Sequence, residues 1–304
     1  MQNDRLLAHT LVLSSVSSPC GNFLIFGTNT QKLLIYSLCS LSCDAQIEGK
    51  PQCIINVKKA KSIYSLCFAK DYVFCGTVGL IIIYKWTSPT DGFLKYYDTV
   101  HVTPSNMYTT ISEFSTCSED GTVCFWDYRV SASGNFKASS IFKPYLIDGL
   151  SRPKLGPWLT ALSCKQGEED WFVTGGGPRL ALWSRRAGRN VSILHPEGAS
   201  SAWYAQTVVF RDMDNDSRIL SGGNSNVLYM WDHMGSLLAS LDLYDPPNSR
   251  ISHILVVDTF NLSESVEALK AKYHSNSAFV VGGCGPVIRL VANLGYPLGV
   301  LHLS

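Results

Sequence analysis

Apolar and polar residues alternate along most of this chain in short runs of four to six, which is the pattern of β-strands and not of helices. The clearest run is 118–127. There an Asp120-Gly121 pair separates two apolar runs, and such a pair supplies the positive φ values that a tight hairpin needs. The second run ends in Trp126-Asp127. A hairpin of this kind closed by Trp-Asp is typical of a blade of a WD-type β-propeller.

The same pattern recurs in diverged form: an apolar strand, a turn, a strand ending in glycine, a second turn, and a strand ending in an aromatic residue. We predict six such units, over 10–38 with an outer strand at 53–57, and over 62–86, 100–129, 158–183, 204–232 and 251–304. Their third strands end at Tyr36, Trp86, Trp126, Trp183, Trp231 and Val291. A four-stranded blade needs about 40 to 45 residues, which these intervals supply. The sequence therefore predicts an all-β fold, a single WD40-type β-propeller domain over 1–304, with a short surface helix at 262–275.

A blade has two apolar faces and cannot bury both alone, so neighbouring blades must stack into a ring. We expect the third-strand aromatics, including Trp183 and Trp231, to pack between blades. In the best unit Thr116, Asp120 and Trp126 occupy the positions of a buried hydrogen-bond network, and His101 is either its fourth member or an ordinary loop histidine. We expect structural roles for the glycines that end second strands, namely Gly175, Gly176, Gly177, Gly222 and Gly223.

Composition narrows the possible functions. The formal net charge is +1 and only 16% of residues are charged. This balance argues against a surface devoted to nucleic acid, which needs clustered lysine and arginine. We find no apolar run long enough for a membrane span, and expect no signal peptide. The ten cysteines are scattered without a Cys-x-x-Cys pair, which favours reduced thiols in an intracellular compartment.

Motifs for hydrolysis, phosphate binding and metal ligation are missing from the sequence, and the seven histidines are dispersed. We therefore predict a protein that is not an enzyme and has no catalytic residues, no metal and no cofactor. The basic residues Arg179, Arg185, Arg186 and Arg189 form the one cationic cluster. It is either a solvated turn or a docking point for an acidic partner segment or an RNA backbone.

A second function of a different class stays open. Trp126, Asp127 and Arg129 fit the Trp-Asp-x-Arg pattern of substrate receptors that dock to adaptors of cullin-type ubiquitin ligases. The pattern also occurs in propellers by chance.

Three stretches resemble one propeller family. They are 17–24 with 35–38, then 151–153 with Trp158 and 170–183, and finally 293–296. The triple glycine at 175–177, followed by Pro178 and a Leu-x-Leu-Trp strand, is unusual among WD proteins. These stretches resemble the family of sixth subunits of the THO complex. The resemblance implies a nuclear, non-catalytic scaffold of a THO/TREX-like complex acting in mRNA processing and export. Its partners would be other THO subunits and export factors, with messenger ribonucleoprotein contacted indirectly and higher-order assembly through the complex.

The chain departs from that family in one respect. The family is expected to have seven blades, whereas six units are recognisable, and only 40 residues separate Trp86 from Trp126, where a further blade would lie. Either the ring closes with six blades or one blade is missing. A missing blade would leave an open wedge with unpaired strand edges, which promote aggregation.

Overall fold

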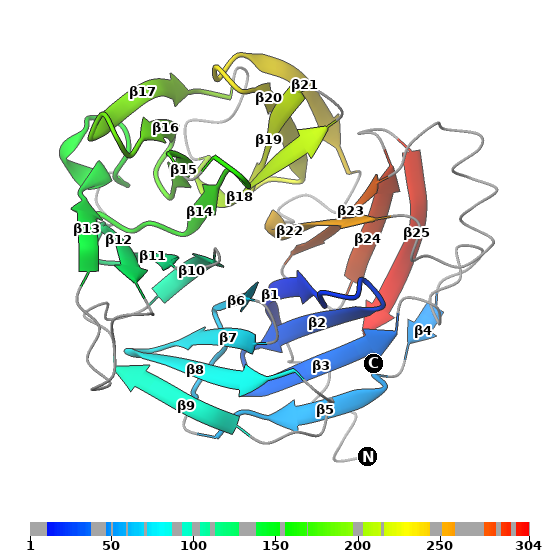
Figure 1. The fold of residues 1–304 in the computed structure, drawn as a ribbon. Coiled ribbons are helices and arrows are strands. Elements are labelled where there is room, and N and C mark those ends of the chain that lie inside the picture. Colours follow the sequence, from blue (N-terminus) through cyan, green and yellow to red (C-terminus); the bar gives the residue numbers. More distant parts are fainter. Residues whose placement is uncertain are drawn as a thin grey trace.

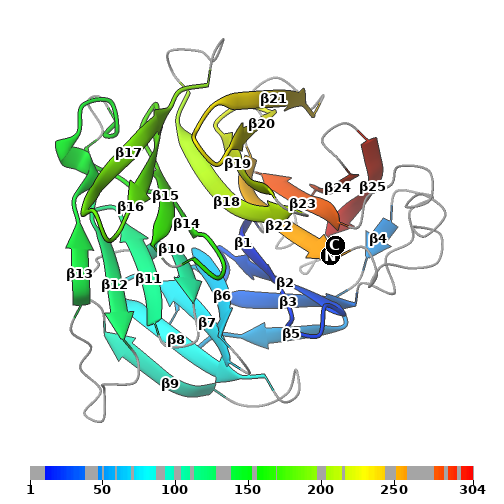
Figure 2. The same ribbon diagram turned by 45° about the horizontal axis from the view of Figure 1, so that its top comes forward.

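The strands of the computed structural model form small antiparallel sheets arranged around a ring (Figures 1 and 2). The structure describes residues 11–37, 47–49, 51–58, 60–69, 72–86, 93–98, 104–109, 113–127, 138–152, 156–168, 170–196, 203–213, 216–243, 251–258, 277–283, 287–292 and 296–303. These residues form six sheets, five of four strands and one of five. The predicted all-β, WD40-type propeller is confirmed.

Each sheet is one blade, numbered in chain order from the innermost strand outward. Blade 1 contains β1 (Val12–Ser17), β2 (Phe23–Thr28), β3 (Lys32–Ser37) and β5 (Cys53–Asn56). Blade 2 contains β6 (Ser65–Ala69), β7 (Tyr72–Thr77), β8 (Leu80–Lys85) and β9 (Phe93–Asp98). Blade 3 contains β10 (Pro104–Thr109), β11 (Glu113–Ser118), β12 (Val123–Asp127) and β13 (Ala138–Phe142).

The second half of the chain continues in the same order. Blade 4 contains β14 (Ala161–Cys164), β15 (Trp171–Gly175), β16 (Leu180–Ser184) and β17 (Arg189–Leu194). Blade 5 contains β18 (Ala205–Met213), β19 (Asp216–Gly223), β20 (Val227–Asp232) and β21 (Leu237–Asp242). Blade 6 contains β22 (Ile251–Asp258), β23 (Ser277–Gly283), β24 (Val287–Ala292) and β25 (Tyr296–Leu303), to which β4 (Ile47–Gly49) is added.

The ring closes with six blades. The innermost strand of each blade contacts the innermost strand of the next, and β22 of blade 6 contacts β1 of blade 1. The interval between Trp86 and Trp126 is filled by β9 and β10, which complete blades 2 and 3. The expectation of seven blades is therefore not met by the described residues, and they leave no open wedge.

Blade 6 is extended at its outer edge by a strand from blade 1. β4 lies between β3 and β5 in the chain and pairs in parallel with β25, placing Ile47 opposite Leu301 and Gly49 opposite Leu303 (Figure 1). All other strand pairs within the six sheets are antiparallel. The join between the last and the first blade is thus spanned by backbone hydrogen bonds.

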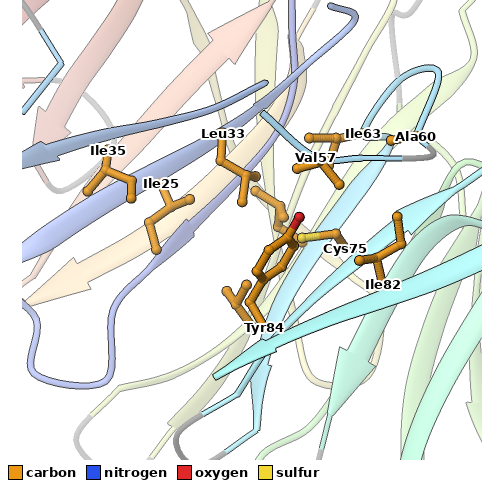
Figure 3. Close-up of a cluster of buried hydrophobic side chains, with 11 residues drawn as sticks. Ile25, Leu33, Ile35, Val57, Ala60, Ile63, Cys75, Ile82 and Tyr84 are labelled. Atoms are coloured by element: carbon orange, nitrogen blue, oxygen red, sulfur yellow. The ribbon is translucent and has the colours of Figure 1, made fainter. Parts of the chain in front are cut away.

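The core lies between blades, as stacking of two-faced sheets requires. Figure 3 shows the interface of blades 1 and 2, where side chains of both sheets meet residues of the connection between them. The cluster contains Ile25, Leu33 and Ile35 of blade 1, Val57, Ala60 and Ile63 of the connection, and Cys75, Ile82 and Tyr84 of blade 2.

Blades 3, 4 and 5 each contain the same kind of buried hydrogen bond. The indole Nε1 of Trp126 donates to Thr116 Oγ1, that of Trp183 to Thr174 Oγ1 and that of Trp231 to Ser221 Oγ, each at 2.9 Å. In every case a third-strand tryptophan is tied to the second strand of its own blade.

Asp120 does not join the bond between Thr116 and Trp126. It is exposed and accepts hydrogen bonds from the backbone N–H and the hydroxyl of Thr122, at 2.8 and 2.7 Å. The carboxylate thus shapes its own turn, as aspartate does in an Asx turn. His101, the candidate fourth member of the network, lies outside the described residues.

Blades 1 and 2 carry tyrosine at the corresponding position. In blade 1 Tyr36 pairs with Leu24 as Trp126 pairs with Phe114 in blade 3. In blade 2 the equivalent residue is Tyr84, opposite Val73, so the expected marker Trp86 is two residues too late. Trp86 follows β8 and packs edge-on against Phe23 and Phe68.

The short surface helix predicted at 262–275 lies outside the described residues.

The cysteines agree with the prediction of reduced thiols as far as they are described. Seven cysteines are described and each is a free thiol. Burial raises the pKa of the Cys124 thiol to about 11, which suits a small apolar packing residue. Among the described residues we find no helix with the length and apolar character to cross a membrane.

Candidate partner-binding surface

A long connection between blades 3 and 4 covers one end of the ring. We call its described residues, 143–152 and 156–160, the connector. It begins with η2 (Pro144–Leu146), a single 3-10 turn. A proline at the start suits this turn, because the missing N–H would have no partner there anyway. Further along, Arg152 and Gly156 pair in an isolated β-bridge.

The connector lies at the end of the ring that carries the turns between second and third strands. We call this end the connector face, and the end with the turns between third and fourth strands the opposite face. In an up-and-down sheet these two kinds of turn necessarily lie at opposite ends of the strands.

The glycines at the turns between second and third strands let the connector backbone approach closely, because they have no side chain. A Cβ on Gly176 would collide with the carbonyl oxygen of Trp158, and one on Gly177 with the carbonyl oxygen of Leu150. On blade 3, a Cβ on Gly121 would lie 2.6 Å from Pro157 Cβ and 2.9 Å from a Tyr145 ring carbon. Backbone therefore rests directly on the turns of both blades, which only glycine permits.

The other glycines accommodate the next blade. A Cβ on Gly175 would lie 2.8 Å from Ala205 Cβ, and one on Gly222 would collide with Ile251. Ala205 and Ile251 begin the innermost strands of blades 5 and 6. The recurrence of glycine at this phase of the repeat thus reflects close approach of neighbouring blades more than turn chemistry. Gly223 lies beneath the indole of Trp203 and the carbonyl of Tyr204.

Arg152 fixes the connector to blades 4 and 5. Its Nε donates a hydrogen bond of 2.5 Å to the Gly176 carbonyl oxygen. Its guanidinium carbon lies 5.6 Å from the ring centre of Trp158 and 5.4 Å from that of Tyr204. A cation on two aromatic faces is a stabilising arrangement, because the ring quadrupole attracts positive charge. Trp158 is held in this way and still keeps 39% of its surface exposed.

Arg179 adds an exposed cation beside the connector. Its side chain lies against Gly149, where an added Cβ would be 3.3 Å from Arg179 Cδ. Within the described part of the chain Arg179 forms no ion pair. Leu146, which is 71% exposed, belongs to the same part of the connector as Gly149.

Arg185 has a different role. Its two terminal nitrogens bind the two carboxylate oxygens of Glu113 on blade 3, at 2.5 and 3.0 Å. Its guanidinium carbon also lies 4.4 Å above the ring centre of Phe125. Both groups are partly buried, so Arg185 joins blade 4 to blade 3 instead of facing a partner.

The four predicted arginines do not form one cluster. Arg179 precedes β16, whereas Arg185 follows it, and the six residue steps between them span about 20 Å at roughly 3.3 Å per residue. Arg186 and Arg189 are exposed at the opposite face, where the Arg186 backbone N–H donates to the Asp170 carboxylate. Only Arg179 lies on the connector face.

The Trp-Asp-x-Arg pattern is not exposed as a unit either, because its tryptophan is buried. Trp126 is 2% exposed and is stacked on Phe114 with ring centres 5.9 Å apart. Asp127 is half-buried, and Arg129 lies outside the described residues. The tryptophan of this pattern therefore serves the fold of blade 3.

Sequence reasoning missed Leu146, which is exposed on the connector, and Glu113, which binds Arg185 between blades 3 and 4. Arg152 and Trp158 drew attention as part of a family resemblance only. Their partners Tyr204 and Gly176 lie on other blades, so no local pattern marks them. Elsewhere in the described ranges, no group of three or more histidine, cysteine, aspartate or glutamate side chains could hold a metal ion.

The chain matches no protein-family model. It is similar to curated proteins with one recurring name. The Homo sapiens "THO complex subunit 6" is 23% identical, over 77% of this chain and 79% of its own length. The Mus musculus homologue is 22% identical over the same shares. The Danio rerio homologue is 22% identical over 95% of this chain and 96% of its own length.

Proposed function

We propose that this chain, a homologue of the THO complex subunit 6 proteins, is a non-catalytic scaffold subunit of a THO/TREX-like complex acting in nuclear mRNA processing and export. The observation that carries the proposal is the similarity to one named subunit over 77 to 95% of the chain, in several vertebrates. The closed ring supports it, because a rigid propeller offers wide surfaces on which partners can assemble.

The proposed partners are other THO subunits and mRNA-export factors, with messenger ribonucleoprotein contacted through them. The net charge of +1 supports indirect contact, since direct binding to a phosphate backbone relies on many cations. The proposed location is the nucleus.

Affinity purification of the tagged full chain from nuclear extract, followed by quantitative mass spectrometry, tests this function. We expect THO subunits at near-equal amounts with the tagged chain. Recovery of cullin-ligase adaptors without THO subunits would overturn the proposal and favour the alternative read from Trp126, Asp127 and Arg129.

A further inference from the structure

We propose that the surface around the connection between blades 1 and 2 binds an acidic segment of a partner protein. Carboxylates of that segment would pair with Lys58 and Lys61, and an apolar side chain beside them would pack on Val78. The inference rests on the proposed scaffold function, because it assigns a surface through which a partner subunit is held. We call the described residues of this connection, 57–58 and 60–64, the lysine connection.

The lysine connection has a buried apolar side and an exposed basic side. Val57, Ala60 and Ile63 are at most 4% exposed and pack against core residues of both blades (Figure 3). Lys58 and Lys61 lie between them in the chain and are exposed. Because the buried side chains fix the backbone, the two lysines are held at the surface of the connector face.

Hydrogen bonds place the lysine connection between the second-to-third-strand turns of the two blades. On the blade 1 side, the Ser62 hydroxyl donates to the Asn29 carbonyl oxygen at 3.3 Å. On the blade 2 side, the backbone N–H of Lys61 donates to Thr77 Oγ1 at 3.4 Å. Val78 follows Thr77 and is 40% exposed. An exposed cation and an exposed apolar side chain are therefore carried by adjoining, bonded backbone.

A third lysine lies at the same end of blade 1. Lys32 begins β3 and stands opposite Asn56, the last residue before the lysine connection. The carbonyl oxygen of Gln31 accepts a hydrogen bond of 2.8 Å from the N–H of Val57, the neighbour of Lys58. The three lysines thus belong to one bonded patch of backbone.

The charge of this patch is not neutralised within the described residues. None of Lys32, Lys58 and Lys61 forms an ion pair with a described residue. The described residues of blades 1 and 2 and of the lysine connection include one acid, Asp98, which ends the outermost strand of blade 2. Three lysines against this one acid leave a net charge of +2 at this end of the two blades. Such a surface is complementary to carboxylates.

The acids of the adjoining blades lie on other elements. Glu48 is on β4 at the outer edge of blade 6, opposite His302. Glu119 and Asp120 belong to the turn of blade 3, where the Asp120 carboxylate is bonded to Thr122. A partner segment should therefore place its carboxylates over blades 1 and 2 and away from the blade 3 turn, because like charges repel.

An acidic protein segment fits this surface better than RNA does. Single-stranded RNA is bound largely by stacking of its bases on exposed aromatic rings. In the lysine connection and the two turns, 28–32 and 76–80, no described aromatic side chain is exposed. The exposed residues there are Gln31, Lys58, Lys61 and Val78. An aliphatic contact beside two lysines suits a peptide that carries acids next to an apolar residue.

The first experiment identifies the occupant by crosslinking amines to carboxylates. The tagged full chain is purified with its partners from nuclear extract and treated with a zero-length reagent that joins lysine directly to aspartate or glutamate. We expect Lys58 or Lys61 to be joined to an acidic residue of a THO subunit. An intact complex in which neither lysine is joined to a partner would overturn the inference. So would ultraviolet crosslinking of RNA to the lysine connection.

The second experiment tests the charge pairing in the same complex. Lys58→Glu combined with Lys61→Glu should lower recovery of the crosslinked subunit about tenfold or more, and exchanging its linked acids for lysine should restore recovery. Lys85→Glu combined with Arg186→Glu reverses two exposed cations at the opposite face and is the matched control. The control should leave recovery unchanged. Equal losses with both pairs, or no loss with the first pair, would overturn the inference.

The two proposals fail in different ways. If the unmodified chain recovers no THO subunits, the proposed function fails, and crosslinking of the complex that it does form still tests the surface. If the doubly substituted Lys58→Glu, Lys61→Glu chain recovers THO subunits as well as the unmodified chain and neither lysine is joined to a partner, the scaffold function stands and only the assignment of this surface is wrong.

Discussion

The ring has two halves that solve the same packing problem differently. Blades 3, 4 and 5 place a tryptophan on the third strand and bond its indole N–H to a hydroxyl of the second strand. Blades 6, 1 and 2 place Val291, Tyr36 and Tyr84 at that position. In blade 1 the Tyr36 ring packs edge-on against Phe26, with ring centres 5.7 Å apart, and its buried hydroxyl has no hydrogen-bond partner among the described residues.

The difference teaches that a large side chain at this third-strand position can fill the space between blades without forming a hydrogen bond. Bulk at this position fills the space between neighbouring blades in either half. The donor adds stability only where the second strand supplies a hydroxyl, because a buried polar atom without a partner costs free energy. The half with these bonds is also the half that carries the connector and the ion pair between Glu113 and Arg185.

Gly176→Ala should damage the bonded half most. The new Cβ would meet the Trp158 carbonyl oxygen and lie 2.8 Å from Leu159 Cα, and backbone atoms cannot rotate away. We expect the free energy of unfolding, measured in urea, to fall by about 3 kcal/mol. Gly167→Ala is the control, since its Cβ would meet nothing within 4 Å and only its left-handed φ of 74° opposes alanine, at about 1 kcal/mol. Equal losses would mean that backbone contact is not the cause.

Thr174→Val should isolate the hydrogen bond of blade 4. The substitution keeps the side-chain shape and leaves the Trp183 indole N–H buried without an acceptor. We expect a loss of about 2 kcal/mol in the same unfolding measurement. Thr174→Ser keeps the hydroxyl, as Ser221 does in blade 5, and should lose clearly less. If serine is as harmful as valine, the methyl group and not the bond stabilises this position.

The ion pair between Glu113 and Arg185, which joins blades 3 and 4, should contribute less to the free energy of unfolding than the hydrogen bond of blade 4. We expect a double-mutant cycle with Glu113→Gln and Arg185→Met to give a coupling free energy of about 1 kcal/mol, because both groups are partly exposed. Added salt should lower this coupling by screening the charges. Arg186→Met, at an exposed neighbour, should leave stability unchanged. A coupling of zero at low salt would show that Arg185 acts through its stacking on Phe125 alone.

Tyr36→Phe should change the free energy of unfolding least, because it removes a hydroxyl to which no described residue is hydrogen-bonded. At pH 8 we expect stability to be unchanged or higher by up to about 1 kcal/mol. Burial raises the pKa of Tyr36 to about 12, from 10 when it is unfolded. The wild type therefore loses stability as pH rises from 10 through 12, because only the unfolded tyrosine ionises easily.

At pH 11 the phenylalanine variant should consequently gain about a further 1 kcal/mol over the wild type. Unfolding followed at pH 8 and pH 11 measures both effects. A loss of 2 kcal/mol at pH 8 would mean that the hydroxyl is bonded and that the two halves are alike.

The strands of this protein could be predicted because alternation of apolar and polar residues is a local property. All six units appeared in the sequence, and the outer strand of blade 1 was expected at 53–57, close to β5. The marker of blade 2 was misplaced, since Trp86 is the larger aromatic but Tyr84 is in register with Val73. Register depends on the partner strand, which composition alone does not reveal.

The candidate surface could not be predicted, because its contacts join distant parts of the chain. Glu113 neutralises Arg185 across 72 positions, and β16 carries Arg179 and Arg185 to opposite ends of blade 4 although they are six positions apart. A cluster in sequence is therefore not a cluster in space when a strand intervenes. The glycine run was recognised, but its purpose depends on the backbone that lies above it.

The parallel pairing of β4 with β25 has a mechanical consequence. Blades 2 to 5 are each joined to both neighbours by the chain itself, whereas blade 6 meets blade 1 without such a link in chain order. Because β4 leaves blade 1 between β3 and β5 and binds β25, it acts as a tether across this seam. A force that pulls the seam open must shear a row of backbone hydrogen bonds as well as separate packed side chains.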